Sequence, residues 1–392
     1  MNKTILFLTM LSGVFLSVAQ QTYVPDDNFE IYLETHDANG NVLPVGDPMS
    51  MGNGVANDDY VITGNINTVT NLNINNQNIT DITGIEDFTA LQTLNCRYNQ
   101  LTSLDLSQNT ALQYLYCNNN LLTSLDLSQN MSLLYLDCFQ NQLTNLMLGQ
   151  QPVLYFIQCF DNQINNLDLS QCTALQHLQC GGNQLTNLDV SLNANLEHLE
   201  CYNNLLSSLD VSQNGLLNYL ICAGNQILSL DLSQNHMLTS FNGSNNRLVY
   251  LNIQNGNNMA MDGNNFNDFM AVNNPQLSCI FVDDAAWSTA NWIYVDATAT
   301  FVETQADCDA LSITDSFLNS FDIFPNPAKD ILNIKSEYSG HLTLYSLTGT
   351  QIKHQNLSTG NNQLDIKLLK SGIYFIKIQV KSKVANFKII KK

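Results

Sequence analysis

Residues 91–109, LQTLNCRYNQLTSLDLSQN, decide the fold of this 392-residue chain, because their pattern returns every 21 residues. Seven cysteines mark the period without a slip: Cys96, Cys117, Cys138, Cys159, Cys180, Cys201 and Cys222. A leucine or isoleucine stands two residues before each cysteine, and an asparagine stands three residues after it. Self-similarity at a fixed short period is the signature of stacked repeats, so the sequence predicts a solenoid.

Two alternating segments in each repeat predict strands. Leu94 and Cys96 should point into the core, while Thr93, Asn95 and Arg97 point out. Residues 103–107 alternate in the same way and predict a second extended segment on the opposite side. Because 21 residues leave no room for a full helix, we predict a mainly β, flattened solenoid. The asparagine column should form a hydrogen-bonded ladder between neighbouring repeats.

The repeat pattern L-x-x-L-x-C-x-x-N-x-L-x-x-L-D-L-S-x-N resembles the leucine-rich repeat, with cysteine in the third apolar slot. The match covers about eight repeats, and a degenerate earlier one at residues 72–85 resembles the internalin type. We therefore place the leucine-rich repeats at residues 72–256, between an N-terminal cap at 20–71 and a C-terminal cap at 257–308. Within the first cap, residues 23–33 predict a short capped helix.

The N-terminal residues predict export. Residues 1–19 are typical of a signal peptide, with Lys3 followed by an apolar run and small residues at the cleavage position. A membrane anchor is the alternative, but the run of about 14 residues is shorter than the roughly 20 that span a bilayer. Nothing later in the sequence is apolar enough to span, so we predict no transmembrane segment.

Residues 321–392 follow a linker at 309–320 and differ from the rest in composition. They carry eleven lysines, the PNPA motif at residues 325–328 and the strand that contains Gly372, Ile373 and Tyr374. They resemble the type A C-terminal sorting domain of the type IX, or Por, secretion system. The resemblance implies a small β-sandwich, the type IX machinery as a partner, and a secreted or outer-surface location on a Gram-negative bacterium. An ordinary immunoglobulin-like spacer is the alternative.

Composition narrows the ligand classes. The chain is 44% hydrophobic, which argues against disorder, and its net charge is −20. Between residues 20 and 320 there are 30 acidic residues against two basic ones, Arg97 and Arg247. Such a body cannot attract phosphate backbones, so we predict no nucleic-acid partner.

The cysteine spacing predicts eight free thiols and one disulfide. The seven cysteines of the repeat column should act as small buried hydrophobic residues, although a metal-binding thiolate ladder is an alternative. Cys172 stands where other repeats have asparagine or glutamine. Cys279 and Cys308 lie beyond the repeats and are the predicted disulfide pair.

The outward columns of the first strand supply the candidate site. No catalytic motif is found, so we predict no enzyme and no catalytic residue. Aromatic rings on an exposed sheet suit a protein or glycan ligand, for example in adhesion. The candidate face comprises Tyr114, Tyr116, Tyr135, Phe139, Phe156, Phe160, His177, His198, Tyr202 and Tyr219. A structural spacer, stabilised by stacking of these rings, is the main alternative.

No metal site and no cofactor are predicted, but three places leave a cation open. His177, His198 and Glu200 could hold a metal in an enzyme. Residues 37–41 resemble part of a calcium loop without its downstream glutamate. Calcium could also relieve a column of aspartates on the second segment, which comprises Asp105, Asp126, Asp168, Asp189, Asp210 and Asp231.

Overall fold

A computed structural model describes residues 19–261, 268–313, 320–347, 350–381 and 383–392. The chain divides into two compact parts, and the boundary between them falls between Glu303 and Thr304. They are described separately below as the repeat body and the C-terminal domain. The predicted signal peptide lies outside the described residues, apart from its last one. None of the helices in the described ranges has both the length and the apolar character needed to cross a bilayer.

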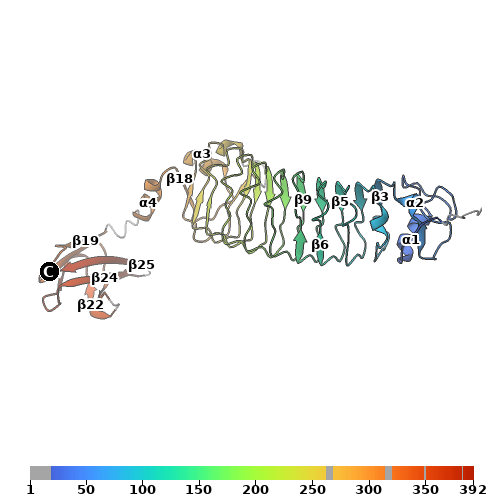
Figure 1. Ribbon diagram of the computed structural model, residues 1–392. Helices are drawn as coiled ribbons and strands as arrows, with labels where there is room; N and C mark the ends of the chain where they lie inside the picture. Colours follow the sequence, from blue (N-terminus) through green and yellow to red (C-terminus); the bar gives the residue numbers. More distant parts are fainter. Residues whose placement is uncertain (1–18, 262–267, 314–319, 348–349, 382) are drawn as a thin grey trace, which may run out of the picture. The chain divides into compact units, whose positions relative to one another are not determined.

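Ten parallel strands form one side of the repeat body (Figure 1). Each pairs in register with the strand of the next repeat, so Leu94, Leu115 and Leu136 face one another in neighbouring strands. This confirms the predicted mainly β solenoid. The strands are β3 (Asn71–Asn73), β4 (Thr93–Asn95), β5 (Tyr114–Tyr116), β7 (Tyr135–Asp137), β9 (Phe156–Gln158), β10 (His177–Gln179), β11 (His198–Glu200), β12 (Tyr219–Ile221), β14 (Ser240–Asn242) and β16 (Phe269–Met270).

The core is built from the inward columns. Leu115 and Cys117 are fully buried, and the same holds at each later repeat through Leu199 and Cys201. Burial of one leucine side chain contributes about 1.5–3 kcal/mol, but a single repeat has no partner surface for it. Stacking therefore provides the core, and one hydrophobic cluster runs from Val24 to Phe301.

The asparagine column forms the predicted ladder. Asn120 donates from Nδ2 to the carbonyls of Cys96, at 3.0 Å, and Cys117, at 3.1 Å, and its Oδ1 accepts from Leu101 N–H at 3.0 Å. Each side chain thus bonds its own repeat and the one before. Equivalent contacts occur at Asn141, Asn162, Asn183, Asn204, Asn225 and Asn246.

A second amide ladder is interrupted at Cys172. Asn130 donates to the carbonyls 24 and 21 residues earlier, those of Leu106 and Asn109. By the same spacing, an amide at position 172 would reach the carbonyl of Leu148. Gln151 reaches that carbonyl instead, at 2.9 Å, because its side chain is one methylene longer than asparagine. The irregular Gln151 therefore compensates in part for the irregular Cys172.

The second side of the solenoid pairs only in places, which corrects the expectation of a continuous second strand. The strands there are β6 (Ser124–Asp126) with β8 (Asn145–Met147), and a sheet of β13 (Ser229–Asp231), β15 (Tyr250–Asn252), β17 (Cys279–Phe281) and β18 (Thr300–Val302). The described residues 103–107 form no strand. Pairing places Asp126 opposite Met147 and Asp231 opposite Asn252. Asp105, Asp168, Asp189 and Asp210 lie outside these strands, and like charges directly opposite one another would be destabilising there.

The solenoid continues past residue 256, where the sequence pattern was expected to give way to a cap. β16 extends the first sheet, and β17 and β18 extend the second. Asn274 takes the ladder position, with Oδ1 accepting from Leu248 N–H at 3.1 Å. It lies 28 residues after Asn246 rather than 21, so the 21-residue period can no longer be recognised in the sequence at this point.

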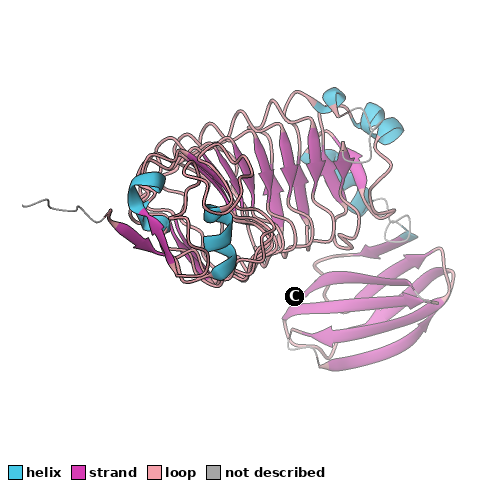
Figure 2. Ribbon diagram, turned by 90° about the vertical axis from the view of Figure 1, so that its right-hand side faces the viewer, coloured by secondary structure: helices cyan, strands magenta, loops and turns pink. Residues whose placement is uncertain are grey.

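Helices lie at the two ends of the repeat body (Figure 2). At the front are β1 (Gln21–Tyr23), α1 (Asp27–Glu34), β2 (Tyr60–Ile62), α2 (Thr63–Ile66) and η1 (Ile85–Asp87). The predicted capped helix is confirmed, since Asp26 Oδ1 accepts from the N–H groups of Asn28 and Phe29. At the back are η2 (Asn258–Ala260) and α3 (Ala285–Asn291), where Trp292 stacks on Phe269 with ring centroids 4.0 Å apart.

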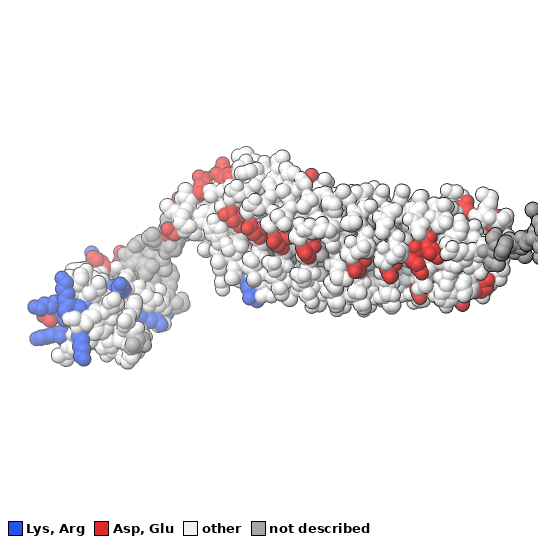
Figure 3. All heavy atoms as spheres, viewed as in Figure 1, with Lys and Arg blue, Asp and Glu red and all other residues white. Residues whose placement is uncertain are grey.

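The C-terminal domain begins with α4 (Gln305–Ile313), so the first part of the expected linker is helical; residues 314–319 lie outside the described residues. Its two antiparallel sheets share one buried core that includes Leu332, Ile334 and Ile376. The basic residues gather on this domain and the acidic ones on the repeat body (Figure 3). The sheets comprise β19 (Phe321–Phe324), β20 (Ile331–Ser336) and β23 (Gly360–Asp365), and β22 (Gln351–Leu357), β21 (Gly340–Ser346), β24 (Gly372–Val380) and β25 (Lys383–Lys391).

Candidate functional site

The three-residue strands of the first sheet position the candidate side chains. In each strand of this sheet from β3 to β12 the middle leucine or isoleucine is buried, so the residues before and after it point away from the core. The candidate residues from Tyr114 to Tyr219 all lie on this outward face, either within a strand or two residues after its last residue. We call these ten residues the aromatic face. Their side chains are half-buried.

Six rings of the aromatic face form an unbroken row along the sheet. The row runs through Tyr116, Tyr135, Phe156, His177, His198 and Tyr219, with successive ring centroids 5.2, 4.4, 5.5, 5.6 and 4.2 Å apart. The Tyr135 and Phe156 rings are nearly parallel, at 8°. Offset stacking of this kind adds about 0.5–1.5 kcal/mol per pair, so the row stabilises the sheet as well as covering it.

A second, separate stack of two rings lies on the same side of the sheet. Phe139 and Phe160 stack with centroids 4.4 Å apart at 9°. Further along, the ring of Tyr202 lies over Gly181, where a side chain in place of the glycine hydrogen would collide with it at 2.5 Å. Gly181 thus makes room for Tyr202, which extends the column of Phe139 and Phe160.

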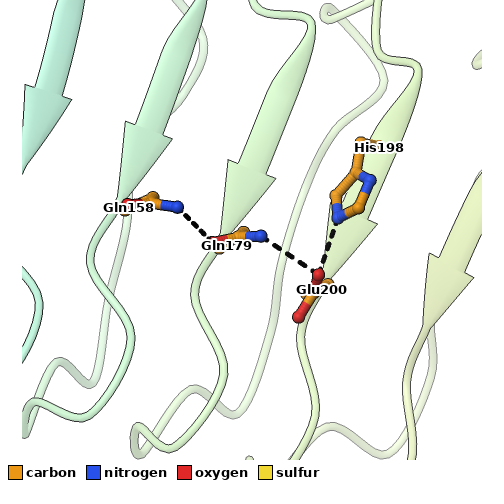
Figure 4. A network of polar contacts seen from close by, with 4 residues as sticks. All are labelled: Gln158, Gln179, His198 and Glu200. Atoms are coloured by element: carbon orange, nitrogen blue, oxygen red, sulfur yellow. Dashed lines mark hydrogen bonds and ion pairs between the residues drawn. The ribbon is translucent and has the colours of Figure 1, made fainter.

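A chain of polar side chains runs between the two aromatic columns (Figure 4). Gln158 Nε2 donates to Gln179 Oε1 at 2.6 Å, and Gln179 Nε2 donates to Glu200 Oε1 at 3.0 Å. The same Glu200 oxygen lies 2.7 Å from His198 Nε2. The amides therefore align in one direction and converge on a single carboxylate.

Asp137 lies on the same side of the sheet as the aromatic face, and sequence reasoning did not select it. It lies in the polar column beside Gln158, is only 6% exposed, and its Oδ1 has no hydrogen-bond partner among the described residues. Burial raises the pKa of its carboxyl to about 6, against the lowering effects of the Phe139 N–H and of Arg97. Its position between the two aromatic columns is the signal that could have found it.

Among the described residues, His177, His198 and Glu200 do not form a group of ligand atoms close enough to hold one metal ion, although the two histidine rings are in contact. His177 packs between the rings of Phe156 and His198, and burial, with His198 second, lowers its pKa, which favours the neutral ring. The contact of Glu200 is with His198. Among the described residues, the group whose ligand atoms lie within 4.8 Å of one another is Asp27, Glu30 and Asp59, in the N-terminal cap.

The two calcium candidates have their carboxylates occupied by their own loops. Asp37 accepts from Asn39 N–H at 2.9 Å and from the backbone and side chain of Asn41. In the aspartate column, Asp168 accepts from Ser170 N–H at 2.9 Å, and Asp105 and Asp210 make the same turn. These contacts lower the pKa of each carboxyl, which keeps the acids ionised.

The cysteine column lies directly beneath the aromatic face. Its thiols are buried and free, as is Cys172, and burial raises the pKa of Cys96 and Cys159 to about 12. Such thiols are neutral and unreactive at physiological pH. Cys279 and Cys308 are disulfide-bonded.

Comparisons with known proteins place both parts of the chain. A family model described as the secretion system C-terminal sorting domain matches residues 322–392. Internalin J of Listeria monocytogenes is 55% identical over 42 residues, which are 11% of this chain and 5% of that protein's length.

Solved structures similar to this chain include the functional domain of InlJ from Listeria monocytogenes, described as including a cysteine ladder. It has a TM-score of 0.47 and 21% identity, over 96% of this chain and 100% of that one. A leucine-rich-repeat protein of Leptospira interrogans has a TM-score of 0.42 and 27% identity over 45% of this chain and 49% of that one. The 21-residue repeats and the matched domain identify the chain as a leucine-rich-repeat protein that carries a type IX (Por) secretion sorting domain.

Proposed function

We propose that this exported protein binds a protein or a glycan through the aromatic face and catalyses no reaction. The unbroken row of six rings from Tyr116 to Tyr219 carries this proposal. Aromatic side chains supply large, rigid contact area, and they are enriched where binding energy concentrates. The sorting domain supports display on, or release from, the outer surface of a Gram-negative bacterium, where adhesion would use such a face.

The half-buried state of the rings suits a binding surface. Each ring is held by its neighbours in the row, so little side-chain freedom remains to be lost when a ligand docks. The face is also held on six neighbouring strands, β5, β7, β9, β10, β11 and β12, whose register is fixed by the buried leucine or isoleucine at the middle of each. A rigid surface of this kind binds with little loss of side-chain conformational entropy.

The test replaces two rings in the middle of the row. The double variant Tyr135→Ala/Phe156→Ala should lose binding to host cells, matrix proteins or an array of glycans, whichever the unaltered chain recognises. Leu192→Ala is the matched control, because this exposed residue lies away from the first sheet. Thermal unfolding identifies a variant that has lost its fold, and Phe156→Lys provides a second change that keeps the side chain long. Full binding by a folded double variant would reject the aromatic face as the site.

A structural spacer remains the second candidate, and the ring stacking favours it. If the rings only stabilise the sheet, the double variant should unfold at a lower temperature while the unaltered chain shows no saturable partner. The same set of measurements therefore separates the two functions.

A further inference from the structure

A hollow at the N-terminal end of the first sheet adjoins the aromatic face. It encloses about 490 Å³ and is bounded by the first three strands of the sheet and by the loop at residues 37–40 of the N-terminal cap. Tyr116, the first ring of the row, forms part of its wall, and Tyr32 of helix α1 forms another part. The row of rings therefore begins at the hollow.

Uncharged hydrogen-bonding groups line the hollow. Asn71 and Asn73 project from β3, and Thr93 and Asn95 project from the facing positions of β4. The side chains of Asn71 and Thr93 have no hydrogen-bond partner among the residues that the structure describes. An amide offers two donors and an acceptor, and a hydroxyl can both donate and accept, so these groups are available to a ligand of the same kind.

The charges at the hollow disfavour an ionic ligand. Neither lysine nor arginine is among the described residues that line it, so an anionic group would find no counter-charge. Its one carboxylate, Asp37, is 8% exposed and already accepts three hydrogen bonds from its own loop. A cation would therefore compete with bonds that hold the loop in place.

We infer that this hollow binds the end of a neutral oligosaccharide, whose hydroxyl groups meet the amide and hydroxyl side chains while the chain continues along the row of rings. A sugar ring carries several hydroxyls, each able to donate and accept, and an apolar face that packs on a tyrosine. This matches a wall of asparagine and threonine closed by Tyr116, whereas the ring of Tyr32 is nearly buried and stacks on His36. The inference rests on the proposed binding role of the aromatic face and names its ligand class.

The experiment measures binding of the full chain to an array of neutral, sialylated and sulfated oligosaccharides, with an array of peptides in parallel. The variant Asn71→Ala/Thr93→Val removes an amide and a hydroxyl from the hollow and leaves the rings in place. Asn165→Ala/Thr186→Val makes the same two changes at exposed positions outside it. Neutral oligosaccharides should bind, and the hollow variant should bind them about tenfold more weakly or worse, with the control unchanged.

Each other outcome separates this inference from the proposed function. Oligosaccharide binding that survives the hollow variant but is lost in Phe156→Ala would overturn the hollow and leave the aromatic face intact. Preference for sialylated or sulfated sugars, or binding to peptides alone, would also overturn it, since neither suits an uncharged sugar site. Absence of saturable binding on both arrays would reject the inference, while the binding to host cells and matrix proteins described above would still decide the proposed function. Thermal unfolding of both double variants shows that the fold is retained.

Discussion

At the scale of single residues, Asp137 opposes the stability of the sheet that carries it. Its carboxyl is almost fully buried among aromatic neighbours, and one oxygen lacks a partner among the described residues. A folded-state pKa near 6, above the ordinary value of 3.8, means that the folded protein binds this proton more tightly than the unfolded chain does. The protonated carboxyl therefore favours the folded protein. This contribution to stability is complete below about pH 4 and is lost as the pH rises through about 6.

Asp137→Asn should stabilise the protein at pH 7.5 but not at pH 4. The difference in pKa of roughly two units corresponds to about 3 kcal/mol of unfolding free energy, which the neutral amide avoids. Urea unfolding at both pH values measures the change. Asp161→Asn, at an exposed position of the next repeat, is the control and should have little effect at either pH. An equal gain at the two pH values would assign the effect to packing rather than to ionisation.

At the scale of the element, the asparagine ladder joins the turns of neighbouring repeats, as strand pairing joins their strands. Asn183 bonds the carbonyls of Cys159 and Cys180 and the N–H of Ile164, so one side chain joins two repeats. It is 8% exposed, and its backbone partners are buried with it. Loss of the amide would leave the Ile164 N–H without its partner, whereas the carbonyls of Cys159 and Cys180 would keep the bonds from Asn162 and Asn204.

Asn183→Ala should therefore lower the free energy of unfolding by about 1–3 kcal/mol, because it leaves one buried N–H group, that of Ile164, unsatisfied. Asn183→Asp should be worse at neutral pH, since it presents a charge and two acceptors to two carbonyls. Asn187→Ala, exposed in the same repeat, should change stability by less than about 0.5 kcal/mol. Urea unfolding compares the three. A cost at Asn183 no greater than at Asn187 would show that water replaces the ladder.

At the scale of the whole molecule, the repeat body behaves as a one-dimensional stack. Each described strand of the first sheet pairs only with its neighbours, and the same columns recur at every step. Stability in such a protein is close to a sum over repeats and their interfaces. Repeats should accordingly be removable in whole periods.

Deletion of residues 174–194, which are 21 in number, should leave a folded solenoid with one repeat fewer. Its calorimetric unfolding enthalpy should fall by about 15 kcal/mol, at roughly 0.7 kcal/mol per residue. Deletion of residues 174–193 instead should fail to fold cooperatively, because the remaining leucine and cysteine columns would be one residue out of register. Equal behaviour of the two deletions would contradict the register argument.

The repeat period predicts much of this molecule because inward and outward positions are decided locally. The ten candidate residues of the aromatic face follow from that alternation, and the structure brings them onto one surface. Features that depend on a neighbour in space were missed. The hollow needs residues 37–40 to reach β3, the burial of Asp137 needs the rings around it, and β16 follows a repeat lengthened to 28 residues.

The division of charge between the two parts also decides where proteases can act. Enzymes that cut after lysine or arginine find eleven such residues between 321 and 392, but only Arg97 and Arg247 between residues 20 and 320. Arg97 is half-buried in the first sheet, which leaves Arg247 as the exposed one of the two. A trypsin-like protease would therefore strip the sorting domain into fragments and leave the repeats in long pieces. The composition that makes the solenoid acidic also makes it resistant to this class of enzyme.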